Sequence, residues 1–303
     1  MNLLNDFVSY LKEEMDNNNI TYGECNDLHD YVMRYFEVKE RNIVFEEPYS
    51  ILESDDFKEE KKLLDLDEKT ILNEIYLKIQ NGKNIDAYVP QDINKRKFDF
   101  LLSNWRIHHI HLQNKNNNGK LIFKNKAKVV LFVINYKTKQ VGFINIIEHP
   151  HGTGWFKRRW LENIDNMFND FLFYLDFVKD VEYDINNDDV IEEAEKKMHL
   201  FIKVNGKVVS PNMGVATSGN SQLAVMKAND ICNYFRRLEK DIVDNIDEYR
   251  KLIIANAKKY NIKLGKNVSK LDFTIIIEDN YVVLYETKYL MKIKLFDFTK
   301  YMN

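Results

Sequence analysis

Five of the seven histidines in this 303-residue chain lie close together, and their spacing predicts acid-base chemistry on a phosphodiester. They form two groups, His108, His109 and His111 in the first and His149 and His151 in the second. An unperturbed imidazole has a pKa of about 6.5, so it can accept or donate a proton near neutral pH. Two imidazoles beside an RNA phosphodiester could activate the 2′-hydroxyl and protonate the departing 5′-oxygen without a metal ion.

Cations and aromatic rings accompany these imidazoles along the chain. Positive side chains stabilise the extra charge of a phosphoryl transition state, and aromatic rings can stack unpaired bases. We expect Arg106 to act in catalysis with His149 and one of His109 or His111, and the residues leave open which imidazole is the base. The side chains expected to contact RNA are Trp105, His108, His151, Trp155, Phe156, Lys157, Arg158 and Arg159.

Charge is unevenly distributed along the chain, whose formal net charge is -3. Residues 95–159 hold fourteen lysines and arginines against two acids, an excess of twelve positive charges. Residues 1–94 hold ten cations against twenty-two acids, an excess of twelve negative charges. This sorting predicts a polyanionic partner for the basic segment, either RNA or the ribosome. The acidic region could cover the basic segment and inhibit it, or a separate protein could be the inhibitor.

Two other functions use the same residues. In the first, His109, His111 and His149 bind a metal ion such as zinc and leave a position open for water, although the surrounding cations oppose a dication. In the second, the basic and aromatic side chains bind RNA or the ribosome without cutting. We expect no cofactor and no bound metal, and we assign His29 and His199 to structure. Cleavage that survives chelation would separate the metal-independent nuclease from both alternatives.

The segment that carries the first three histidines admits two geometries. On a strand, side chains alternate, so His109 and His111 would share one face with Ile107, while Arg106 and His108 would share the other. On a helix, His108 and His111 would instead be neighbours. The choice decides which imidazoles can act together.

Hydrophobic periodicity and turn residues predict an α+β protein of three domains. The domains are an acidic helical domain over residues 1–90, a basic α+β domain with an antiparallel sheet over 91–165, and an α+β domain with hairpins and one long helix over 166–303. The helices expected most clearly span residues 67–80, with Asp67 as the cap and Asn81-Gly82 as the stop, 167–178, and 221–260. The strands expected span 121–124, 128–135, 141–148, 199–204, 207–210, 271–277, 281–286 and 291–298.

Cysteine content and hydropathy indicate the cellular compartment and limit the possible partners. The two cysteines, Cys25 and Cys232, lie far apart and lack metal-binding spacing, which favours reduced thiols in the cytoplasm. No apolar run approaches the roughly 20 residues of a membrane-spanning helix, so we expect no membrane association. The apolar stripe of the predicted helix over 221–260 could form a homodimer seam.

In residues 95–165 the chain resembles the RelE/YafQ group of toxin endoribonucleases, small α+β domains that cleave messenger RNA. The matching positions are His109 or His111 before the apolar strand 129–134, His149 at the end of the next strand, and Trp155 or Phe156 after it. The resemblance implies a metal-independent endoribonuclease of toxin type, in a toxin-antitoxin or antiviral defence setting. The chain differs from that group in two respects: it carries no acid between Gln113 and Glu148 to match the catalytic aspartate, and it is about three times as long.

Overall fold

We analysed a computed structural model of the chain, which confirms the α+β class. The structure describes residues 1–22, 25–41, 43, 45, 47–89, 99–113, 128–148, 156–178, 201–211, 220–259 and 271–301. It divides into two compact units, Met1–Glu40 with Ala224–Asn303 as unit 1 and Arg41–Leu223 as unit 2. These limits differ from the boundaries expected near residues 90 and 165, because unit 1 is built from the two ends of the chain and unit 2 includes most of the acidic region.

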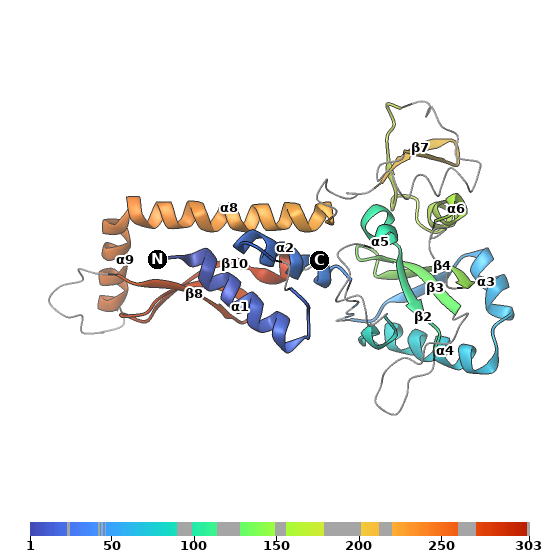
Figure 1. Cartoon of the computed structure of the whole chain (residues 1–303), viewed down its shortest axis with the longest axis horizontal. Helices are drawn as coiled ribbons and strands as arrows, with labels where there is room; N and C mark the ends of the chain where they lie inside the picture. The colour runs from blue at the N-terminus through green and yellow to red at the C-terminus, as the bar shows by residue number, and fades with distance from the viewer. Residues whose placement is uncertain are drawn as a thin grey trace. The chain divides into compact units, whose positions relative to one another are not determined.

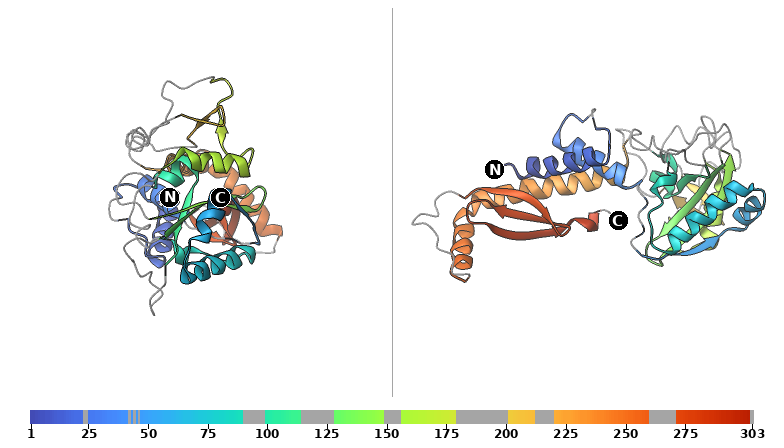
Figure 2. Two further views of the ribbon diagram at one scale, coloured as in Figure 1. Left: turned by 90° about the vertical axis from the view of Figure 1, so that its right-hand side faces the viewer. Right: turned by 90° about the horizontal axis from the view of Figure 1, so that it is seen from below.

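Unit 1 packs N-terminal helices against C-terminal helices and strands, so segments far apart in sequence lie side by side (Figures 1 and 2). Its core joins apolar side chains of both, among them Phe7, Phe235 and Phe298. Its elements are α1 (Leu3–Asn17), α2 (Leu28–Lys39), α8 (Gln222–Asp244), α9 (Ile246–Lys259), the antiparallel strands β8 (Phe273–Glu278), β9 (Tyr281–Glu286) and β10 (Met291–Asp297), and the short helix η3 (Phe298–Tyr301).

The long helix expected over 221–260 is two helices, because α8 ends at Asp244 and α9 begins at Ile246. The apolar stripe of α8, which includes Ile231 and Phe235, lies in the core of unit 1. The stripe is therefore used within the chain, and it does not support the homodimer expected through this helix. The three strands expected in the last forty residues are confirmed with small shifts of their ends.

A buried carboxylate holds the end of β9 in place. Glu286 is fully buried, and its two carboxylate oxygens accept hydrogen bonds from the backbone N–H groups of Asp272 at 2.8 Å, Lys288 at 3.0 Å and Tyr289 at 2.6 Å. These amides belong to the chain entering β8 and to the turn after β9. One buried side chain thus satisfies three backbone donors of two separate segments.

Unit 2 is built on a four-stranded sheet with helices on both faces (Figure 1). The strands are β1 (Ser50–Glu53), β2 (His108–His111), β3 (Lys128–Asn135) and β4 (Gln140–Glu148), in the order β1-β4-β3-β2. One face packs against α3 (Asp55–Lys62), α4 (Leu66–Gln80) and the turn η1 (Asp86–Tyr88), and the other packs against α5 (Phe100–Trp105) and α6 (Arg158–Met167). Burial on both faces explains why β3 is a continuous run of apolar residues.

Several expected elements of unit 2 are confirmed, and others differ. The strands expected at 128–135 and 141–148 form an antiparallel pair, and Gly82 ends α4 with a φ of +64°. The cap of α4 is Asp65, in a capping box with Glu68, so the expected cap at Asp67 was two residues too late. Strand β1, which pairs parallel to β4, was missed because four residues are too few to show a period.

The helix expected over 167–178 was also wrong. Helix α6 ends at Met167, and Phe173 and Tyr174 form β5, a strand of a small second sheet with β6 (Ile202–Val204) and β7 (Lys207–Ser210). The hairpin between β6 and β7 is confirmed, because Asn205 and Gly206 have φ angles of 46° and 80°, as a tight turn of this kind requires.

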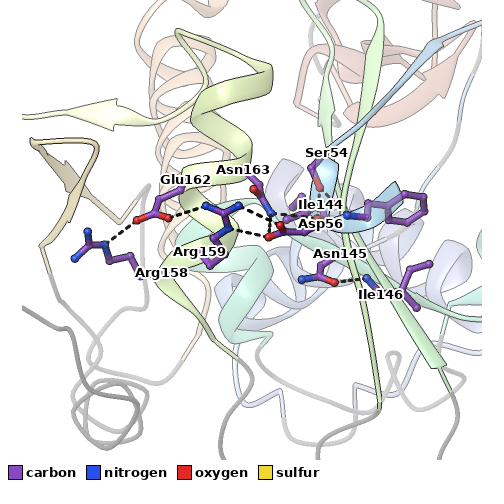
Figure 3. A network of polar contacts seen from close by, with 10 residues as sticks. Ser54, Asp56, Ile144, Asn145, Ile146, Arg158, Arg159, Glu162 and Asn163 are labelled. Atoms are coloured by element: carbon purple, nitrogen blue, oxygen red, sulfur yellow. Dashed lines mark hydrogen bonds and ion pairs between the residues drawn. The ribbon is translucent and has the colours of Figure 1, made fainter. Parts of the chain in front are cut away.

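A polar network joins α3 and α6 to β4 (Figure 3). The ladder between β3 and β4 shifts register at Ile144, and its carbonyl accepts hydrogen bonds from Ser54 Oγ at 2.5 Å and Asn163 Nδ2 at 3.4 Å. Asp56 accepts two more from Arg159, at 2.8 and 3.1 Å, and one from Asn163 at 2.9 Å. The bulge thus frees a carbonyl that side chains of both helices satisfy.

Candidate functional site: a polar row on an edge strand

The structure shows which of the two expected geometries, strand or helix, the first histidine group adopts. Helix α5 ends at Trp105, and Arg106 caps it in the left-handed region with a φ of 56°. From His108 the chain is a strand, in which His109 lies opposite Leu131 and His111 opposite Val129. The expectation that His109 and His111 share one face is confirmed, whereas Arg106 belongs to the helix cap rather than to the strand.

His109 is paired with a carboxylate from the preceding helix. Its Nδ1 lies 3.5 Å from Oδ2 of Asp99, which also caps α5 by accepting a hydrogen bond from the N–H of Leu102 at 3.1 Å. The side chains of His109 and Asp99 are 9% and 16% exposed. A carboxylate beside Nδ1 favours a proton on that nitrogen and leaves the basic lone pair on Nε2. Asp99 was not among the expected site residues, although its place directly before a helix signals a capping role.

The same face continues along β2 to Gln113. The rings of His109 and His111 are 6.1 Å apart between centroids, and His111 is 1% exposed. The N–H of Leu112 still bonds to the carbonyl of Lys128 at 2.9 Å, so alternation places Gln113 on the side of His109 and His111. We call Asp99, His109, His111 and Gln113 the polar row. Strand β2 is the last strand of this sheet in the described part of the chain.

His108 faces the other side of the sheet. Its ring stacks on Phe132 with the centroids 5.4 Å apart, among the core residues that pack against α3 and α4. Burial lowers the pKa of His108 from 6.5 to about 4, against a smaller opposing effect of Asp99, and His109 lowers it further. His108 is therefore a neutral core residue at pH 7, and the structure does not support its expected contact with RNA.

The buried His108 should make the protein less stable in acid. Because its folded pKa lies below that of the unfolded chain, its contribution is complete above about pH 6.5 and is lost as the pH falls toward 4. Between pH 7 and pH 4.5 we expect the natural chain to lose about 2 kcal/mol more free energy of unfolding than His108→Phe, which cannot titrate. Urea unfolding at both pH values measures this difference, and equal losses would contradict the prediction.

Two aromatic residues expected to stack RNA bases lie in the core. Trp105 and Phe156 are 4% and 3% exposed, and their rings stack on each other with the centroids 5.3 Å apart. Trp160, on α6, packs edge-on against Phe156. These rings belong to the hydrophobic core that packs α5 and α6 against the sheet, so the structure does not support their expected stacking with RNA bases.

The cations after β4 are partly paired with acids. Arg158 Nε bonds to Glu162 at 3.1 Å, and Arg159 is held by Asp56 of the acidic region. Lys157 is exposed at the cap of α6, and Arg106 is exposed before the start of β2. A second pair, Lys139 with Glu47 at 2.6 Å, also joins the acidic and basic segments. These two ion pairs thus join the acidic and basic segments within unit 2. Inhibition of the basic segment by the acidic region stays a prediction.

Three of the expected site residues, His149, His151 and Trp155, lie outside the described residues. The last described residue before them is Glu148, whose Cα pairs with Lys128. Lys128 precedes Val129, the partner of His111. Residues 113, 128 and 148 therefore meet at one end of the sheet, and the role of His149 stays a prediction.

The three-histidine metal site cannot be assessed whole, because it includes His149. Within the described ranges, the polar row does not bring three metal-ligand side chains within 4.8 Å of one another, and only Asp27, His29 and Asp30 do so. That group, with Asp27 exposed and His29 and Asp30 partly buried, lies at the N-terminus of α2, whose dipole opposes a cation. His29 Nε2 lies 3.0 Å from Oδ1 of Asn229, in keeping with a structural role.

No protein-family model, curated protein or solved structure matches the chain. None of the helices in the described part of the chain has the length and apolar content to cross a membrane.

Proposed function

We propose that unit 2 binds RNA and cleaves it through the 2′-hydroxyl, with His109 as the general base. The observation that carries the proposal is the pairing of His109, on β2, with Asp99, the N-cap of α5. A histidine that acts as a general base must be held in one tautomer, and the Asp99 carboxylate beside Nδ1 favours the tautomer with the proton on Nδ1. The chain departed from the RelE/YafQ group in lacking a downstream acid, and Asp99 offers a carboxylate from upstream.

The reaction balances without a metal ion. The proton of the 2′-hydroxyl passes to Nε2 of His109, the 2′-oxygen bonds to phosphorus, and the bond from phosphorus to the 5′-oxygen breaks. A second imidazole gives its proton to that leaving oxygen, and we assign this role to His149. The products are a 2′,3′-cyclic phosphate and a 5′-hydroxyl. We assign the stabilisation of the phosphate charge to Arg106 and Lys157, which are both exposed.

RNA binding without cleavage is the second candidate. It is favoured by the low exposure of the polar row, since the side chain of His109 is only 9% exposed. Under this candidate the cations of residues 95–159 bind the backbone of RNA or of the ribosome, and the imidazoles support the sheet. A toxin-type role in antiviral defence, or under an inhibitory partner, belongs to the first candidate.

One experiment separates these candidates. We would incubate the purified full chain with single-stranded RNA, with and without EDTA, and map the new ends. We expect cleavage that survives EDTA and leaves 2′,3′-cyclic phosphates. Binding without new ends would support the second candidate, and loss of cleavage on chelation would support a metal-dependent hydrolase. Binding should weaken steeply with salt in each case.

A further inference from the structure

Gln113, at the end of the polar row, is buried without hydrogen bonds. It is 5% exposed, and neither Nε2 nor Oε1 has a hydrogen-bond partner within the described structure. Burying an amide donor and an acceptor unpaired costs free energy, because both groups lose their bonds to water. Native proteins keep few such groups, and each calls for a reason.

Two other buried side-chain amides of unit 2 do form hydrogen bonds. Asn163 is 3% exposed, and its Nδ2 donates to Asp56 at 2.9 Å and to the carbonyl of Ile144. Asn104 is 2% exposed, and its Nδ2 donates to the carbonyl of Phe100 at 3.0 Å. Unit 2 therefore satisfies buried amides where they serve packing, and Gln113 is the exception among these three.

Gln113 lies on the same side of the strand as His109, the proposed general base. His111 also lies on that side, and two-residue steps of about 6.7 Å place the Cα of Gln113 about 13 Å from that of His109. In the described part of the chain β2 is the outermost strand of its sheet, so a ligand that approaches His109 and His111 from that side need not separate strands.

We propose that Gln113 binds the hydrogen-bonding edge of an RNA base held at the polar row. This inference deepens the proposed function and rests on it. A phosphate offers only acceptors, so it would pair with Nε2 and leave Oε1 unsatisfied. A base edge presents a donor beside an acceptor and satisfies both atoms of the amide. The ligand group is therefore a base edge rather than a phosphate.

The test combines stability with base preference in the full chain. Gln113→Leu removes the unpaired amide at similar size, so we expect a Tm equal to or above that of the natural chain. The matched control, Asn163→Leu, removes a satisfied amide of similar burial and should lower the Tm. Gln113→Glu replaces the donor with a second acceptor and should shift preference toward guanine, whose N1–H and N2–H both donate.

Base preference is measured as the affinity for single-stranded homopolymers of A, C, G and U at one salt concentration. We expect the natural chain to bind them unequally, and Gln113→Leu to reduce the ratio of strongest to weakest affinity by about tenfold. An unchanged ratio, or a fall in Tm like that of Asn163→Leu, would overturn the role of Gln113 even if the chain cleaves RNA. If the natural chain binds the homopolymers unequally, Gln113→Leu removes the difference and no RNA is cleaved, the role of Gln113 would stand and the nuclease proposal would fail. No binding to any homopolymer overturns both.

Discussion

Replacing His109 with Gln is expected to lower the rate of RNA cleavage by about 10²- to 10⁴-fold, because the variant cannot accept the 2′-hydroxyl proton. The expected cost in folding is small, since the side chain is similar in size and remains polar beside Asp99. Initial rates on a labelled single-stranded RNA, with circular dichroism as the check on folding, measure the effect. Activity within about threefold of the natural chain would exclude His109 as the base.

Asp99→Asn tests the partner of His109 separately. Asparagine caps a helix about as well as aspartate, so α5 should be retained while the negative charge beside Nδ1 is lost. We expect a lower kcat and an altered pH dependence of kcat/KM, with little change in RNA affinity. Because both residues act as one unit, the double variant should be scarcely slower than His109→Gln alone.

The neighbouring histidine provides the control for position. His108 precedes His109 in sequence, yet it lies on the opposite face of the sheet and stacks on Phe132. His108→Phe should therefore keep cleavage close to that of the natural chain at pH 7. A loss as large as that of His109→Gln would show that the segment acts through folding, and the assignment of a base would fail.

Replacing Glu286 with Ala is expected to cost about 3 to 5 kcal/mol of unfolding free energy, because three backbone N–H groups would lose their hydrogen bonds to a buried carboxylate. Hydrogen exchange should show the loss of protection in β8, β9 and β10. Since the polar row lies in unit 2, strands β2 and β3 should keep their protection. Urea unfolding gives the size of the effect.

A surface acid of the same sheet is the matched control. Glu278 pairs with Lys292 at 2.7 Å, but both side chains are more than two-fifths exposed. Exposed ion pairs contribute about 1 kcal/mol or less, so Glu278→Ala should change stability little. Equal effects of the two substitutions would refute the account of Glu286 as a buried acceptor for three donors.

Local patterns in the sequence predicted much of the fold. Strands β3 and β4, the Asn205-Gly206 hairpin and the three C-terminal strands follow from alternation and turn residues, which act over a few neighbouring positions. The shared face of His109 and His111 followed from the same alternation. Long-range choices could not be predicted in this way, and these include the parallel pairing of β1 with β4 and the joining of residues 1–40 to 224–303.

The sequence by itself determined the residue types available to the site and their order along one strand face. Only the tertiary structure decided their surroundings: it paired His109 with Asp99, buried Trp105 and Phe156, and left the amide of Gln113 unsatisfied. The physical reason is that alternation is a property of a single strand. Burial and charge pairing depend instead on which helices pack against that strand, and α5 and α6 are placed there by contacts across the whole of unit 2.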